Sequence, residues 1–224
     1  MELMHTVHVP SGAGPFPTIL ALHGFGASAH DLFGIAPLVN QVVPGGDVLF
    51  LCPQGPITLE PQPGQLAYAW FPLTGGGELD PMALVAARGL LEGFVDDALA
   101  AYPIDPERLI VMGFSQGGVM AYDLALGRPD RYAALIALST WLPDEVVSGL
   151  QNDPARAELA TLLVHGTNDP MVAIDNGRAS LERLKELGIQ AAWGEYEMGH
   201  EINQAALRDL LGWIAQGPLA PAGG

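Results

Sequence analysis

The sequence predicts an α/β fold with one mainly parallel β-sheet and helices on both of its faces. Short apolar runs of strand length alternate with longer segments of helical spacing along the 224 residues, which is typical of βαβ units. The residues of chemical interest follow these runs directly, where parallel sheets form their sites. With 49% hydrophobic residues, the chain can bury one large core. We expect a single domain over 1–216 and a flexible tail, rich in proline and glycine, over 217–224.

In the first half of the chain, loose alternation over residues 3–9 predicts an edge strand. The continuous apolar run at 18–22 is typical of a strand covered on both faces. A helix is expected at 31–41 and another buried strand at 47–52. Residues 53–77 are dense in proline and glycine, which predicts a long loop or a set of short pieces.

The second half opens with a long helix, to about residue 101, because Asp80 can cap its N-terminus and Pro81 suits its first turn. The remaining predicted elements alternate as strand 109–112, helix 119–126, strands 132–138 and 161–165, helix 174–187, strand 190–196 and helix 201–216. Gly188 ends the helix before it. The pattern is that of a parallel sheet throughout.

Composition disfavours several classes of function. The net charge is −16, from 25 acidic and 9 basic residues, which argues against binding nucleic acid or anionic lipid. The single cysteine, Cys52, excludes an internal disulfide and a multi-cysteine zinc site. No helix-spaced His and carboxylate pair suggests a metal, and no cofactor is expected. Without a secretory signal or a membrane-length apolar run, we expect a cytoplasmic protein.

The strongest chemical signal is the Gly-x-Ser-x-Gly pattern at 113–117, between an apolar strand and a helix. A turn this tight strains the backbone at Ser115, and side chains at the two glycines would collide with it. The turn exposes the hydroxyl at the start of the helix, where free N–H groups point at the same spot. A Gly-Ser turn without chemistry is the plain alternative. The flanking strand and helix favour a nucleophile elbow.

A serine nucleophile needs a base, and six histidines compete for that role. His200, in the loop after the last strand, is the preferred base. His23 and His165 each follow a buried strand directly and precede a glycine, a position more typical of a structural histidine. The other three, His5, His8 and His30, read as ordinary surface residues.

The acid of a triad on this kind of sheet comes between the serine and the histidine in chain order. Asp169 fits because it follows a buried strand. Asp175 reads instead as a charge at a helix start, and Glu195 and Glu197 lie too close to His200 in sequence to orient it easily. Asp169 is therefore the expected partner of the base.

Acyl transfer also needs donors where negative charge develops on the substrate oxygen. The backbone N–H of Gln116, directly after the nucleophile, is one candidate. The second is the N–H of Phe25, in the loop that follows the strand at 18–22, where flanking glycines let the amide turn inward. Together they predict an oxyanion hole made of backbone groups.

Six segments carry a resemblance to a known family: LHGFG at 22–26, AWF at 69–71, GFSQGG at 113–118, LSTWLP at 138–143, HGTNDP at 165–170 and MGH at 198–200. Together they resemble the phospholipase/carboxylesterase family of α/β-hydrolases, which includes bacterial carboxylesterases and acyl-protein thioesterases. An elbow alone occurs in many hydrolases, whereas the combination with Trp-Phe and Leu-Ser-x-x-Leu-Pro is more specific. The match spans nearly the whole chain.

The resemblance implies Ser115, Asp169 and His200 as a catalytic triad. It also suggests a substrate pocket formed by Trp70, Trp141, Leu142, Met171 and Val172, for which core packing is the plain alternative. Two positions depart from the family: Phe25 stands where leucine is common, and Pro72 where aspartate is frequent. Both affect the shape of the acyl groove and leave the chemistry intact.

These observations predict a serine carboxylesterase of the α/β-hydrolase fold that cleaves short- to medium-chain acyl esters. Too few residues separate the strands at 132–138 and 161–165 for a large cap domain. Acyl-protein thioesterase or lysophospholipase activity is the nearest alternative, and a non-catalytic binding protein the more distant one. The expected partner is a small-molecule ester, without nucleic acid or stable membrane association. Oligomeric state stays open, with a homodimer as one option.

Overall fold

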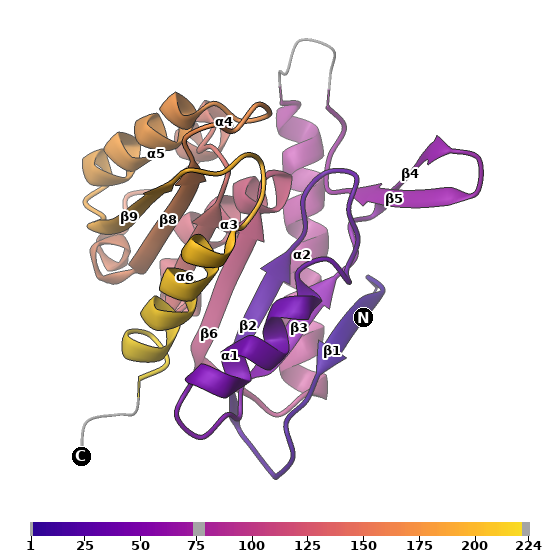
Figure 1. Cartoon of the computed structure of the whole chain (residues 1–224), viewed down its shortest axis with the longest axis vertical. Coiled ribbons are helices and arrows are strands. Elements are labelled where there is room, and N and C mark those ends of the chain that lie inside the picture. The colour runs from indigo at the N-terminus through magenta and orange to yellow at the C-terminus, as the bar shows by residue number, and fades with distance from the viewer. Residues whose placement is uncertain (1, 74–78, 221–224) are drawn as a thin grey trace.

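A computed structural model describes residues 2–73 and 79–220, and it contains a central seven-stranded sheet in the order β1-β3-β2-β6-β7-β8-β9 (Figure 1). Only β1 runs antiparallel to its neighbour β3, and every other pair is parallel. The strands are β1 (His5–His8), β2 (Phe16–Leu22), β3 (Leu49–Pro53), β6 (Ile104–Phe114), β7 (Ala134–Leu138), β8 (Ala160–Gly166) and β9 (Ala191–Tyr196). The predicted parallel sheet with an edge strand near the N-terminus is confirmed.

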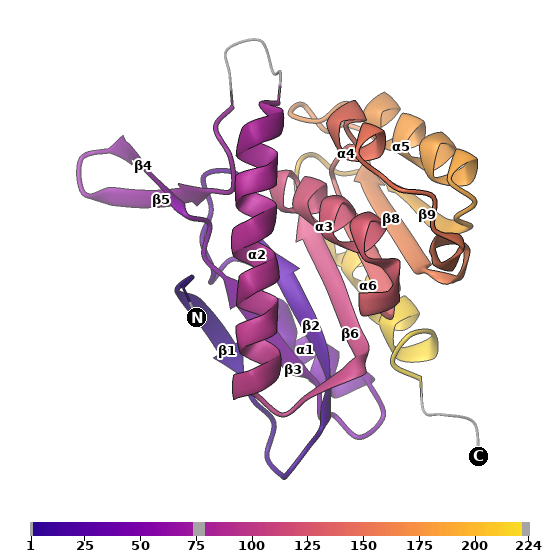
Figure 2. The ribbon, with the colours of Figure 1, turned by 180° about the vertical axis from the view of Figure 1, so that it is seen from behind.

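Helices cover both faces of this sheet. The helices are α1 (Ala36–Val42), α2 (Pro81–Ala101), α3 (Gln116–Gly127), α4 (Asp144–Ser148), α5 (Ile174–Glu186) and α6 (Gln204–Gln216). Helices α1 and α6 lie on the face toward the viewer in Figure 1, and α2 to α5 lie on the opposite face, seen in Figure 2. Asp80 caps α2 as predicted, because its carboxylate accepts the N–H of Met82 at 2.9 Å.

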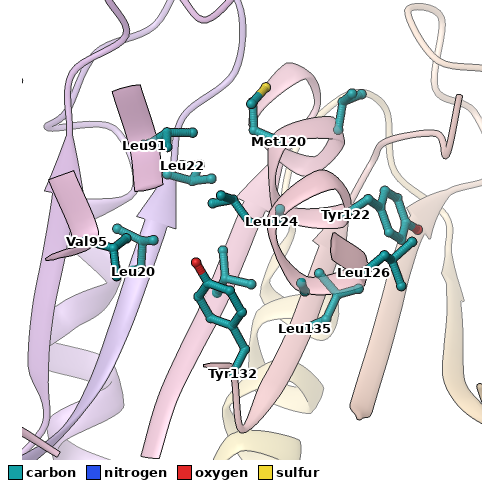
Figure 3. Close-up of a cluster of buried hydrophobic side chains, with 14 of the residues drawn as sticks. Leu20, Leu22, Leu91, Val95, Met120, Tyr122, Leu124, Leu126, Tyr132 and Leu135 are labelled. Carbon is teal, nitrogen blue, oxygen red and sulfur yellow. The ribbon is translucent and has the colours of Figure 1, made fainter. Parts of the chain in front are cut away.

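The alternation of side chains along the central strands builds two cores. Leu20 and Leu22 of β2 face Leu91 and Val95 of α2 (Figure 3), and all four are buried. The alternate residues of β2, such as Ile19, point to the other face and pack in the core under α1 and α6. Both faces of β2 are therefore covered by apolar packing, which explains its nearly continuous apolar sequence.

The segment predicted as a long loop or short pieces contains a hairpin, β4 (Ile57–Gln62) with β5 (Gln65–Ala69), that projects from the body of the molecule (Figure 1). Gly64, with a φ of 79°, closes its turn. The base of the hairpin, opposite the turn, is anchored, because Tyr68 exchanges backbone hydrogen bonds with Gly26 and Ala27 at 2.9 Å. The hairpin is thereby tied to the loop after β2.

The connection from β7 to β8 holds only the short helix α4 and a 3-10 turn at Pro154–Glu158, neither of which was predicted. This connection, residues 139–159, is described in full and leaves no room for a cap domain. Helix α6 begins at Gln204, slightly later than predicted, after a cap in which Asn203 accepts the N–H of Ala206. Of the expected tail, residues 217–220 are described and Leu219 is buried, while 221–224 lie outside the described residues.

A search of the described ranges for membrane spans finds no helix that combines the necessary length with sufficient apolar character. Helix α2, the longest of the helices, places its apolar side against the sheet. Its residues Leu84, Leu91 and Phe94 pack within the fold, whereas Met82 and Val85 are exposed.

Arg88 of α2 and the buried Asp123 of α3 form a two-pronged ion pair, with Arg88 Nε donating to Asp123 Oδ2 at 2.6 Å. Burial raises the pKa of Asp123, and the guanidinium opposes that shift. We expect Arg88→Met to lower the free energy of unfolding by about 3 kcal/mol at pH 7, since it leaves a buried carboxylate without its partner. The measurement is urea unfolding.

The matched control for this pair is the double variant Arg88→Met/Asp123→Leu. Because it removes both charges, its unfolding free energy should return close to that of the wild type. Equal losses in the single and double variants would contradict the prediction.

Candidate active site

Ser115 occupies the strained turn that the sequence predicts, between the end of β6 and the start of α3. Its φ is 52° and its ψ is −119°, in a region that residues with side chains rarely adopt. A Cβ added to Gly113 would lie 2.1 Å from the carbonyl oxygen of Gly117, and one added to Gly117 would lie 2.1 Å from that of Leu22. Both glycines are therefore required for this turn.

Asp169 and His200, far apart in sequence, form a direct hydrogen bond. Asp169 follows β8 and His200 lies between β9 and α6. The Nδ1 of His200 donates to Oδ2 of Asp169 at 2.7 Å. In the neutral ring this leaves Nε2 without a proton and able to accept one.

Asp169 is buried and held by the backbone that follows it. Its Oδ1 accepts the N–H groups of Met171 at 2.8 Å and Val172 at 2.9 Å. Burial alone would raise the pKa of Asp169, but the Val172 amide, His200 and the Met171 amide together lower it below its ordinary value. The residue is a carboxylate at neutral pH, and both of its oxygens are occupied.

The ring of His200 packs against the ring of Phe114, with 4.8 Å between centroids. Phe114 is the residue directly before Ser115, so this contact puts the imidazole beside the turn that carries the hydroxyl. The side chain of His200 is 20% exposed, which leaves the ring accessible from solvent. The fold thus gathers the ends of β6, β8 and β9 at one edge of the sheet.

The predicted oxyanion donors flank this turn. Gln116 is the first residue of α3, where a backbone N–H has no partner within the helix. The N–H of Phe25 has no acceptor among the described residues. A Cβ on Gly24 would lie 3.3 Å from the Cβ of Ser115, so the loop that carries Phe25 touches the elbow.

Side-chain hydrogen bonds hold that loop in place. The Nε2 of His23 accepts the N–H of Gly55 at 2.9 Å, so its Nδ1 carries the proton and donates to the carbonyl of Gly24 at 2.8 Å. The indole of Trp70 donates to the His23 carbonyl at 2.8 Å. The structural role predicted for His23 is confirmed.

The side chain of Gln116 ties the elbow to the segment after β5. Its Oε1 accepts the N–H of Trp70 at 2.8 Å, and its Nε2 donates to the carbonyl of Phe71 at 2.7 Å. Gln116 is buried, and both ends of its amide are satisfied. Sequence reasoning used only the backbone of Gln116 and missed this role of its side chain.

The five predicted pocket residues are placed differently from one another. Trp70, Leu142 and Val172 are buried, Trp141 is half-buried and Met171 is 74% exposed. Val172 is connected to the triad by its N–H, which donates to Asp169 at 2.9 Å, and its carbonyl accepts from Nε2 of His165 at 2.8 Å. Contact of these five residues with substrate stays a prediction.

Burial lowers the pKa of His23 below its ordinary value of 6.5. The unfolded chain therefore binds a proton first as pH falls, and stability present above pH 6.5 is lost as pH drops toward the folded pKa. We expect the free energy of unfolding to fall below pH 6.5 with a contribution from His23 of at most about 1.4 kcal/mol per pH unit. Urea unfolding of wild type and His23→Gln at pH 7 and pH 5 measures this.

The His23→Gln variant should be less stable than the wild type at pH 7 and should lose less stability between pH 7 and pH 5. A His30→Gln variant, at an exposed position, serves as the control and should keep the wild-type dependence. Identical pH dependence in His23→Gln and wild type would show that another group is responsible.

Comparison with known proteins adds the family to this geometry. A sequence profile described as Phospholipase/Carboxylesterase matches residues 6–216, nearly the whole chain. The chain belongs to the phospholipase/carboxylesterase family. The resemblance drawn from the six sequence segments is thereby confirmed, and the protein is an ester-hydrolysing enzyme of the α/β-hydrolase fold.

Relatives within the family carry two kinds of name. Acyl-protein thioesterase 1 of Mycosarcoma maydis is 28% identical over 91% of this chain and 92% of its own. Carboxylesterase SOBER1 of Arabidopsis thaliana is 27% identical over 88% of each chain.

Two solved structures named as esterases share the architecture. Esterase PE8 is 27% identical, with a TM-score of 0.78 over 96% of this chain and 99% of its own. The carboxylesterase of Bacillus cereus, at 20% identity, has a TM-score of 0.80 over 96% of this chain and 94% of its own, which shows the common fold.

Proposed function

We propose that this family member is a serine carboxylesterase in which Ser115 is the nucleophile, His200 the general base and acid, and Asp169 the residue that orients His200. The observation that carries the proposal is the 2.7 Å hydrogen bond from His200 to Asp169 beside the strained elbow. It leaves the acceptor nitrogen of the imidazole free for a serine proton.

In the first step, Ser115 Oγ attacks the ester carbonyl carbon while its proton passes to Nε2 of His200. Negative charge develops on the carbonyl oxygen, where the N–H groups of Phe25 and Gln116 are available to stabilise it. The C–O bond to the alcohol then breaks, and His200 returns the proton to the departing oxygen. The products are an acyl-serine and a free alcohol.

In the second step, water attacks the acyl-serine and gives its proton to His200. The same oxyanion donors stabilise the second tetrahedral intermediate. Collapse of that intermediate releases the carboxylic acid, and the proton on His200 returns to Ser115. The carboxylate of Asp169 stabilises the imidazolium in both steps, and its lowered pKa keeps it ionised throughout.

For the substrate we propose short- to medium-chain acyl esters. The short β7–β8 connection supports this, because it provides no cap to enclose a long chain. Thioester hydrolysis is the second candidate, favoured by the relative named acyl-protein thioesterase 1. Lysophospholipid hydrolysis uses the same chemistry and stays an alternative.

We also propose a cytoplasmic location, consistent with the single buried Cys52, whose thiol pKa burial raises to about 12.

A panel of aryl esters with acyl chains of increasing length, assayed beside an acyl thioester and a lysophospholipid, tests the proposed substrate. We expect kcat/KM to be highest for short to medium chains and to exceed that for a thioester of the same acyl group. A maximum at long chains, or a faster thioester, would contradict the assignment.

Labelling of Ser115 by a fluorophosphonate separates an active enzyme from a binding protein, whose serine would not react.

A further inference from the structure

A cavity of about 410 Å³ lies beside the elbow, and its lining includes residues before α1 and on α6. Its lining includes Gly24 and Phe114, which both adjoin Ser115. The apolar part of the lining includes Ile35, just before α1, and Leu207 on α6. The cavity falls in the size range of small-ligand sites. It also contains none of the five residues predicted for substrate binding.

His200, the proposed general base and acid, lies next to this cavity. Its ring packs on Phe114, which lines the cavity, and the next two residues, Glu201 and Ile202, line it as well. The general acid must reach the oxygen of the departing alcohol, so the alcohol leaves on the side of His200. The acyl chain extends from the other side of the carbonyl carbon. The cavity lies on the side of the elbow where His200 packs, which is the side expected for the alcohol portion of an ester.

The charged side chains of the cavity are both acidic. Asp31 is held by Ser28, whose N–H and hydroxyl donate to Oδ2 at 2.6 Å and 2.7 Å. Glu201 is exposed at the second position. Two carboxylates beside an apolar lining, on a chain of net charge −16, favour a neutral or positive group and disfavour a negative one.

We propose that this cavity is the alcohol subsite of the enzyme, and that it selects esters of apolar alcohols whose outer end is neutral or cationic. The proposal depends on the serine mechanism above and goes further, since it specifies the alcohol and not the acyl group. It also disfavours alcohols that carry a free carboxylate or phosphate.

The variant Leu207→Trp tests the apolar part by filling the cavity. Methyl butyrate and benzyl butyrate form the same acyl-enzyme, so a difference in their kcat/KM comes from steps up to release of the alcohol. We expect kcat/KM for benzyl butyrate to fall about tenfold or more, because a pocket that loses its space rejects the larger group. Methyl butyrate should stay within about twofold of wild type.

Leu211→Trp is the matched control, because Leu211 lies one turn further along α6 and lines a separate hollow with Val42 and Pro44. It should leave both esters unchanged. If Leu207→Trp instead slows methyl esters of longer acids and spares benzyl acetate, the cavity holds the acyl chain and the proposal is wrong. Unchanged rates in Leu207→Trp for the methyl and the benzyl esters alike would also overturn it.

The charge is tested without altering the packing by Glu201→Gln. Choline butyrate and 3,3-dimethylbutyl butyrate have the same shape and differ in the positive charge, so their ratio of kcat/KM cancels any effect of the variant on His200. We expect wild type to prefer the choline ester and the variant to reduce that ratio about three- to tenfold. An unchanged ratio, or a preference for an anionic alcohol, would overturn the charge selection.

Failure of the serine mechanism gives a different result from failure of this proposal. Wild-type rates in Ser115→Ala would remove the mechanism altogether. Normal fluorophosphonate labelling of Leu207→Trp and Glu201→Gln, together with unchanged selectivity for the alcohol, would leave the mechanism intact and reject the subsite alone.

Discussion

Replacement of Ser115 by alanine is expected to lower kcat about 10⁴- to 10⁶-fold on any ester that the enzyme accepts. The variant removes the oxygen that forms the acyl-enzyme, so only oxyanion stabilisation and binding remain. Alanine has no special tolerance of the φ of 52° at this position, but its Cβ matches that of serine. The fold should therefore persist while the chemistry is lost. Initial rates on a short-chain aryl ester provide the measurement.

Ser139 supplies a matched control for this variant. It follows β7, the neighbouring strand, has a φ of 45° and is buried. Its hydroxyl has no hydrogen-bond partner among the described residues, so Ser139→Ala removes no bond and should keep activity within about threefold of wild type. A loss of only tenfold in Ser115→Ala, or equal losses in both variants, would refute Ser115 as the nucleophile.

The parts of the site predicted from sequence are those with local causes. The elbow follows from two glycines and a serine between a strand and a helix, because that spacing leaves no room for other side chains. Asp169 and His200 follow from position, since both lie after strands of a parallel sheet whose carboxyl ends share one edge. The 2.7 Å hydrogen bond between them is the geometric result.

The parts not predicted depend on contacts between distant segments. The indole of Trp70 donates to the carbonyl of His23, which is 47 residues away in sequence. The backbone N–H of Trp70 donates to the side chain of Gln116, which is 46 residues away. Nothing in the local pattern of a Trp-Phe pair indicates these partners, and the pocket role that the resemblance implies for Trp70 stays a prediction. The cavity between the segments before α1 and α6 likewise exists only after both helices pack on the same face.

The hairpin β4–β5 escaped prediction for a different reason. Most residues of β4 are exposed, and its apolar-polar alternation lasts only from Ile57 to Glu60 before Pro61, so no sustained pattern marks it. What stabilises its position is backbone pairing of Tyr68 with Gly26 and Ala27. Those bonds involve no side chain and therefore leave no trace in the sequence.

The variant Asp169→Asn should lower kcat by about 10⁴-fold, because it places the proton on the wrong nitrogen of His200. Oδ1 of Asp169 accepts two backbone N–H groups, from Met171 and Val172. An asparagine must put its carbonyl oxygen there, since an amide NH₂ would face two other donors. The NH₂ then faces Nδ1 of His200, which must become an acceptor. The proton moves to Nε2, and the ring can no longer take the proton of Ser115.

Asp175→Asn is the control for this prediction, because Asp175 is the nearby carboxylate that sequence analysis considered and set aside. Its side chain is 87% exposed and pairs with Arg178 at 3.3 Å, so its charge is worth little and activity should be unchanged. The steady-state kcat of both variants on one ester decides between them. If Asp175→Asn loses activity and Asp169→Asn keeps it, the acid of the triad is misassigned. If neither loses activity, His200 needs no carboxylate to hold its proton on Nδ1, and the tautomer argument is wrong.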